Sequence, residues 1–270
     1  PLTYSLIYFF LGESVSGNLF FVITLFTIIF GGSIGFYIAK KIDMTALPQL
    51  LAAFHSLVGL AAVFIAAAVF TSPSLFGIAL NSKLIPASNS IEMSLGAAIG
   101  AVTFTGSVVA FGKLQGFISG KPLRYSGQHK INLTIALTIV AMITAFVFNQ
   151  SSLLFTSIII FSFAIGYLLI MPIGGADMPV IVSMLNSYSG WAAAGIGFTL
   201  NNEILIIVGA LVGTSGAILS NIMCKGMNRS LINVIFGGVG SESEVLTPQN
   251  SNHGNVKLCS AEDAGFIVKN

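Results

Sequence analysis

The sequence predicts an all-α fold, a polytopic transmembrane helix bundle with seven full spans and one partial N-terminal span. Three observations predict it. Only 7% of the 270 residues are charged, against about 25% in an ordinary soluble domain. Hydrophobic residues make up 55% of the chain, and its mean hydropathy is +0.93. Finally, the apolar residues gather in runs of the length that a bilayer requires.

The same numbers exclude other classes of protein. A soluble globule of this size could not cover its surface with so few charges, and disordered chains are polar and rich in charge. A net charge of +2 offers no extended basic face for nucleic acid. The two cysteines, Cys224 and Cys259, have no metal-ligand spacing and cannot form a disulfide framework.

Seven apolar runs approach or exceed the roughly 20 residues that cross a bilayer as a helix. The run before them, Pro1–Leu11, is about half that length, and we expect it to be the tail of a helix whose start precedes this sequence. The third full run is longer than a membrane needs, so part of it should project or tilt. The expected spans are Gly17–Ala39, Ala46–Phe70, Ile91–Ile118, Ile131–Phe148, Ser152–Ile170, Met178–Leu200 and Glu203–Cys224.

Beyond residue 236 the sequence changes character. We expect residues 1–236 to form the membrane domain and residues 237–259, rich in Gly, Ser and Asn, to form a flexible linker. Residues 260–270 resemble the capped start of a helix. They are therefore expected to be the first residues of a further soluble domain.

The basic residues predict the orientation. Alternating loops place eight of the 11 Lys and Arg residues on one side of the membrane, and only Lys83 on the other. The positive-inside rule assigns the eight to the cytoplasm, or to the matrix of a mitochondrion, and the C-terminus would lie on that side. The eight are Lys40, Lys41, Lys113, Lys121, Arg124, Lys130, Lys225 and Arg229.

Polar side chains inside spans are costly unless they have partners, so they are the candidate functional residues. His55 is the only titratable side chain near the middle of an expected span. It could be a neutral histidine that hydrogen-bonds across a helix interface. The alternative is a proton acceptor, because imidazole titrates near physiological pH.

Asn186 lies in a polar run, Asn186–Ser189, deep in the sixth full span. Hydrogen bonding between helices would explain Ser187 and Ser189, whereas the depth of Asn186 favours a functional role. His55 and Asn186 lie at similar depth, because each follows the inner end of its span by about 12–14 Å. The two side chains could therefore meet.

Two further polar residues have competing interpretations. Ser107 lies in the inner half of its span, where a serine commonly bonds back to its own helix. Its depth is also close to that of His55 and Asn186, which would suit a hydrated half-channel. Asp177 stands just before the Met178–Pro179 helix start, where an aspartate is usually a cap and dipole partner. Alternatively, it relays between the channel and the soluble domain.

Three small-xxx-small motifs predict close helix packing without naming a partner. They begin at Gly31, Gly96 and Gly209. The sequence has no Gly-rich dinucleotide fingerprint, no P-loop and no metal cluster. We therefore expect no cofactor and no metal within this chain.

Several long stretches resemble one family. They are VTFTGSVVAFGKLQ at residues 102–115, GGADMP at 174–179, MLNSYSGWAA at 184–193, GALVGTSGAILS at 209–220 and IMCKGMNRS at 222–230. Over about residues 17–240 the chain resembles the beta subunit of proton-translocating NAD(P) transhydrogenase, or the equivalent region of the single-chain mitochondrial enzyme.

The resemblance implies a function and partners. Family members couple hydride transfer between NAD(H) and NADP(H), bound in soluble domains, to proton passage through the membrane domain. It implies that His55, Ser107 and Asn186 belong to the proton channel and that Asp177 takes part in coupling. The implied partners are a C-terminal NADP(H)-binding domain, an alpha subunit with the NAD(H)-binding domain and membrane helices, and a second copy of the membrane domain. The implied location is a bacterial or mitochondrial inner membrane.

The residues alone also allow other classes of membrane protein. One is a small-solute transporter, and another is a structural, dimerising subunit. A transporter would be expected to show inverted repeats with broken helices at matching positions. Only one Gly-rich break is visible, at Gly174–Gly175, and it has no counterpart.

Overall fold

The computed structural model describes residues 17–78 and 84–235. The chain divides into two units, Pro1–Val239 and Gly240–Asn270, and every described residue belongs to the first. The partial span at Pro1–Leu11, the linker at 237–259 and the domain start at 260–270 lie outside the described residues.

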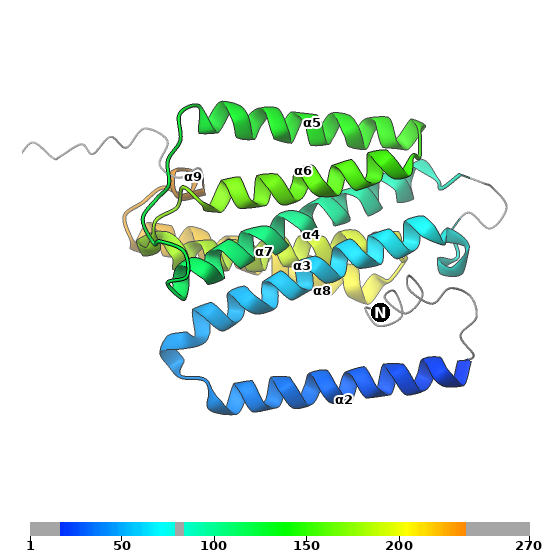
Figure 1. The fold of residues 1–270 in the computed structure, drawn as a ribbon, viewed down its shortest axis with the longest axis horizontal. Coiled ribbons are helices and arrows are strands. Elements are labelled where there is room, and N and C mark those ends of the chain that lie inside the picture. The colour runs from blue at the N-terminus through cyan, green and yellow to red at the C-terminus, as the bar shows by residue number, and fades with distance from the viewer. Residues whose placement is uncertain (1–16, 79–83, 236–270) are drawn as a thin grey trace, which may run out of the picture. The chain divides into compact units, whose positions relative to one another are not determined.

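The described ranges are all-helical, which confirms the predicted fold class (Figure 1). Short 3-10 turns precede or follow some of the helices, at Met44–Ala46, Pro73–Phe76 and Gly175–Asp177. The helices are α2 (Gly17–Lys41), α3 (Leu47–Thr71), α4 (Ala87–Leu114), α5 (Gln128–Phe148), α6 (Ser152–Ile170), α7 (Met178–Thr199), α8 (Glu203–Gly226) and the short α9 (Leu231–Ile235).

Six of these eight helices are long and apolar enough to cross a membrane. The short α9 is not, and neither is α7, which has 22 residues but carries the polar run at Asn186–Ser189. The predicted count of seven full spans is therefore not confirmed by length and hydropathy alone. The long α7 does fill the place of the sixth predicted span, Met178–Leu200, to within one residue.

Proline and glycine set several helix boundaries. Pro48 and Pro179 stand in the first turns of α3 and α7, where the missing N–H costs no helical hydrogen bond. Gly77, Gly116 and Gly127 have positive φ angles of 73°, 78° and 77°, a conformation that glycine adopts without strain. These glycines lie in the connections that follow α3, follow α4 and precede α5.

The most buried helices are α4 and α7. Helix α4 packs against α3, α6 and α7, and α7 packs against α3, α4 and α8. Helix α5 packs mainly on α6, beside which it runs in Figure 1. Because protein surrounds α7, its polar side chains meet other helices and need not face lipid.

Glycines bring the central helices close together. A Cβ added at Gly100 would lie 2.8 Å from the Gly59 carbonyl oxygen of α3, and one at Gly209 would lie 2.7 Å from the Gly190 carbonyl oxygen of α7. Two of the predicted close-packing motifs, those beginning at Gly96 and Gly209, thus pack as expected. The third does not, because a Cβ at Gly31 or Gly35 would meet nothing within 4 Å. None of the described side chains of α2 is among the buried residues, and no described helix packs against this motif.

Lys113, one of the eight basic residues that the sequence assigns to the inner side, is buried, with 6% of its surface exposed. Its Nζ donates hydrogen bonds to the carbonyl oxygens of Ile170, Met171 and Ile173, at 3.2, 2.6 and 2.7 Å. The last carbonyls of a helix lack helical partners, and a cation there also complements the helix dipole. Lys113 of α4 therefore caps the end of α6 and fixes the connection to α7.

Replacing Lys113 with Met should lower the free energy of unfolding by about 2–3 kcal/mol, since Met fills similar space but donates nothing to the three carbonyls. Unfolding of the detergent-solubilised protein would measure this. The matched control is Lys121→Met in the exposed α4–α5 connection, which should change stability by less than about 0.5 kcal/mol. Equal effects of the two substitutions would contradict the capping role.

Candidate functional site

A cavity of about 380 Å³ lies between α3, α7 and α8, near the end of the bundle where α3 and α7 begin. We call it the His55 cavity. Both residues that the sequence placed at similar depth, His55 and Asn186, line it. Its remaining wall is mainly apolar, and its other lining residues are Leu47, Pro48, Leu51, Pro179, Val182, Ser183, Leu219 and Met223.

Two similar helix starts bring His55 and Asn186 to one level. Helices α3 and α7 each have a proline in their first turn, Pro48 and Pro179, and both prolines line the cavity. His55 and Asn186 each follow that proline by seven positions, which is two helical turns or about 10 Å. Each side chain thus faces the same side of its helix as its proline.

Ser189 holds the His55 ring. Its Oγ lies 3.2 Å from His55 Nδ1 and donates a hydrogen bond of 2.8 Å to the Asn186 carbonyl oxygen. The direction of the contact between Ser189 and His55 depends on which ring nitrogen carries the proton. In neutral imidazole the nitrogen without a proton is the basic one. The contact therefore orients a histidine that can accept and release a proton.

Ser189 was not singled out by the sequence as a partner of His55. Hydrogen bonding between helices was one interpretation of Ser187 and Ser189, and both serines make such contacts. Ser189 contacts His55 of α3, and the Ser187 Oγ donates to the Gly213 carbonyl oxygen of α8. Ser183 likewise donates to the Gly216 carbonyl oxygen at 3.1 Å. These bonds fix the rotation of α7 against α8 and so direct Ser189 toward α3. The partner of each serine depends on which helices become neighbours, and the sequence alone does not distinguish the three serines.

Ser107 lies apart from the other two channel candidates. It is fully buried on α4, and its Oγ has no hydrogen-bond partner among the described residues. The structure does not place it among the residues lining the His55 cavity. Helix α4 does pack against both α3 and α7, so Ser107 belongs to the same helix core.

Asp177 does not cap α7. It occupies the N-cap position, but its carboxylate makes no capping hydrogen bond, so the capping interpretation was wrong. Arg229 Nη1 instead lies 2.8 and 3.0 Å from the two carboxylate oxygens. This ion pair joins the start of α7 to the turn between α8 and α9.

A double-mutant cycle would measure this ion pair. Asp177→Asn and Arg229→Gln should show a coupling free energy of about 0.5–1 kcal/mol in unfolding measurements, because the arginine is 41% exposed and solvent screens the pair. The matched cycle of Asp177→Asn with Lys225→Gln, at an exposed basic residue near the same end of α8, should give a coupling close to zero. Equal coupling free energies in the two cycles would contradict a specific ion pair between Asp177 and Arg229.

Within residues 17–78 and 84–235, no three His, Cys, Asp or Glu side chains gather in a way that could hold a metal ion. The polar groups at the site are an imidazole, an amide and hydroxyl groups. Such groups bind and transfer protons and order water.

Comparison with known proteins shows the family. The model of the NAD(P) transhydrogenase beta subunit family matches residues 4–270. NAD(P) transhydrogenase subunit beta of Rhodospirillum rubrum is 57% identical over 241 residues, which cover 89% of this chain and 52% of that protein. The same subunit from a designated strain of that organism matches with equal identity and coverage. This chain thus spans about half the length of these relatives, has several apolar helices suited to a multi-pass membrane protein, and belongs to the NAD(P) transhydrogenase beta subunit family.

Proposed function

We propose that this chain is the proton-conducting membrane domain of a proton-translocating NAD(P) transhydrogenase. In this proposal proton passage through the bundle is coupled to hydride transfer between NAD(H) and NADP(H), which are bound by other domains of the enzyme. In this proposal no residue of the described ranges, 17–78 and 84–235, takes part in hydride transfer. Family membership does not support the alternatives of a small-solute transporter or a purely structural subunit.

The His55 cavity is the observation that carries this proposal. A titratable ring and an amide, from two different helices, line one cavity, and Ser189 orients the ring through a hydroxyl at 3.2 Å. Ionisable residues inside a membrane protein usually mark an ion or proton path. In this role His55 takes and releases the proton, while Asn186 holds the adjacent water. Ser107 is proposed to serve the same path from the neighbouring helix α4.

Coupling to the soluble domains is assigned to the end of the bundle that contains Asp177. Asp177 binds Arg229, and Lys225 is exposed nearby in the sequence. These residues would relay between the channel and the NADP(H)-binding domain. Such a relay requires that both sites bias one element with two arrangements.

The proposed partners follow from the length of the relatives as well as from the family. The curated relatives are about twice as long as the matched region, and we assign an NADP(H)-binding domain to the part of such a protein that this chain does not cover. An alpha subunit would supply the NAD(H)-binding domain and further membrane helices. Two copies of the membrane domain would form a dimer. The distribution of basic residues supports a proposed C-terminus on the cytoplasmic or matrix side of a bacterial or mitochondrial inner membrane.

The direct test uses the complete enzyme in sealed lipid vesicles. Hydride transfer from NADPH to an NAD⁺ analogue should change the internal pH, and a protonophore should abolish that change while hydride transfer continues. A complete enzyme that transfers hydride without moving protons would overturn the proposal.

A further inference from the structure

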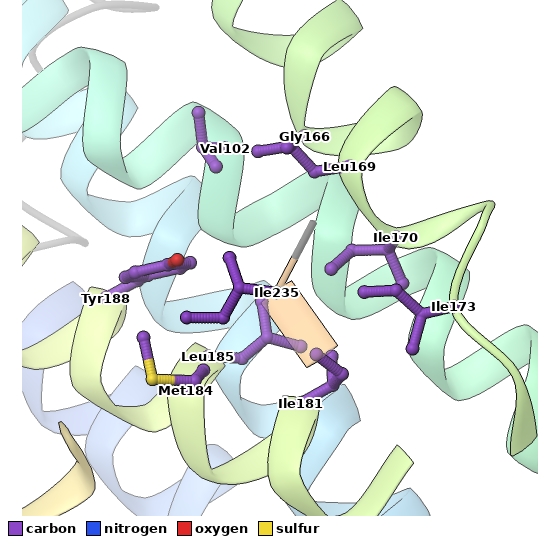
Figure 2. Close-up of a pocket in the computed structure, with 10 residues that line it drawn as sticks. All are labelled: Val102, Gly166, Leu169, Ile170, Ile173, Ile181, Met184, Leu185, Tyr188 and Ile235. Carbon is purple, nitrogen blue, oxygen red and sulfur yellow. The ribbon is translucent and has the colours of Figure 1, made fainter. Parts of the chain in front are cut away.

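The short helix α9 inserts a side chain between the central helices. Figure 2 shows Ile235, the last residue of α9, among side chains of α4, α6 and α7. We call this pocket the Ile235 socket. Its other lining residues are Val102, Gly166, Leu169, Ile170, Ile173, Ile181, Met184, Leu185 and Tyr188.

The Ile235 socket is apolar and nearly full. Its unfilled volume is about 20 Å³, room for no more than about one water molecule. The preceding residue, Val234, is 1% exposed and belongs to the adjoining core cluster. The Asp177–Arg229 ion pair holds the turn that leads into α9. Helix α9 is thus anchored by two apolar side chains and one ion pair.

Helix α7 lies between the Ile235 socket and the His55 cavity. Ile181, Leu185 and Tyr188 line the socket, whereas Val182 and Asn186 line the cavity. These positions alternate along α7 with helical spacing, so they lie on two different faces of one rigid helix. A displacement of α7 at the socket must therefore also move Asn186.

Helix α4 gives the socket a second connection to the channel candidates. A Cβ added at Gly106 would lie 3.2 Å from side-chain atoms of both Ile170 and Leu185, two socket residues. Ser107, the next residue, is fully buried. Closely packed cores change between discrete arrangements and do not deform continuously. Removing Ile235 from the socket would change how α4 and α7 pack.

We propose that Ile235 is a positioning residue that couples the chain beyond α9 to the proton site, by occupying the Ile235 socket in one nucleotide state and leaving it in another. This inference rests on the proposed function. Residues 237–259, which follow α9 directly, are expected from the sequence to form a linker. Ile235 acts through α7 and does not itself touch the proton.

The first test compares two isoleucines of the same short helix in the complete enzyme. Ile235→Ala should lower the number of protons moved per hydride transferred by about three- to tenfold, the range typical of residues that modulate coupling. Ile232 is 67% exposed, and Ile232→Ala should leave this ratio unchanged. Ile235→Val should restore most of it, which separates socket occupancy from a general loss of folding.

The second test reads the socket directly. In an enzyme whose other reactive cysteines are replaced, Ile235→Cys should react with a maleimide several-fold faster in one state, NADP⁺-bound, NADPH-bound or empty, than in another. Ile232→Cys should react at similar rates in all of them. These rates do not depend on proton movement, so they report on the socket even if the proposed function fails.

The outcomes distinguish the two proposals. Uniform labelling of Ile235→Cys together with normal pumping by Ile235→Ala would overturn the coupling role while leaving the proton channel intact. State-dependent labelling in an enzyme that moves no protons would overturn the proposed proton channel and would support the movement of Ile235 into and out of the socket.

Discussion

Replacing His55 with Ala should abolish coupled proton movement, with a loss of about 100-fold or more in the complete enzyme in vesicles. A positioned proton acceptor typically contributes a factor of about 10²–10⁴, and no other histidine of the described chain lies inside the bundle, since His129 is exposed at the start of α5. The measurement is the rate of internal pH change per enzyme during hydride transfer. The redox reaction should slow with it when the two are tightly coupled.

The control for this substitution is His129→Ala, which removes an exposed histidine and should leave pumping unchanged. Ser189→Ala offers a graded variant, because it removes only the hydroxyl that lies 3.2 Å from His55 Nδ1. It should reduce pumping less than His55→Ala, since the imidazole remains. Wild-type pumping by His55→Ala would exclude the proton-carrier role.

Hydropathy predicted the ends of a helix well where the helix is apolar along its whole length. The run at Ser152–Ile170 coincides with α6. The predicted span Ile91–Ile118 is displaced, because α4 already begins at Ala87 with polar residues and ends at Leu114. The prediction from apolar runs left out Ser88 and Asn89, which are polar but lie at the start of the helix. It included Phe117 and Ile118, which are apolar but follow Gly116, a residue with a positive φ angle that ends the helix.

Depth along a helix could be predicted from the sequence, but rotation around it could not. His55 and Asn186 were expected at one level because each lies a similar number of residues after the start of its span, and both line one cavity. For both to line this cavity, α7 must also have the right rotation about its axis, which the hydrogen bonds of Ser183 and Ser187 to α8 fix. The capping of α6 by Lys113 depends in the same way on which helices become neighbours.

Helix α7 shows why the least apolar long helix can be the central one. It alone among the long helices fails the hydropathy criterion for a span, yet most of its residues are buried. The polar side chains of a helix packed among other helices are not exposed to the hydrocarbon of the bilayer. Such a helix can therefore carry the asparagine and serines that are costly on lipid-facing helices. In this chain the least apolar long helix is thus one that other helices bury.

Close contact between α7 and α8 should make Gly190 intolerant of any side chain. A Cβ at this position would lie 2.8 Å from both the Gly209 carbonyl oxygen and the Gly213 Cα, and closer still to the Gly213 nitrogen. These are backbone atoms, which cannot change rotamer to make room as a flexible side chain can. Helices α7 and α8 must therefore move apart. Overpacking of this kind costs about 1–3 kcal/mol, and Gly190→Val should cost more than Gly190→Ala. Unfolding in detergent would measure both.

The separation should also damage the proton path, because α7 and α8 both contribute walls to the His55 cavity and Gly190 follows Ser189 directly. We expect Gly190→Ala to lower the pumping rate severalfold even at temperatures where the protein stays folded. The control is Gly32→Ala in α2, where an added Cβ meets nothing within 4 Å and alanine improves helix propensity by about 1 kcal/mol. A Gly190→Ala enzyme as stable and active as Gly32→Ala would show that α7 and α8 can move apart without cost, and would contradict the rigid α7 on which both the site and the socket depend.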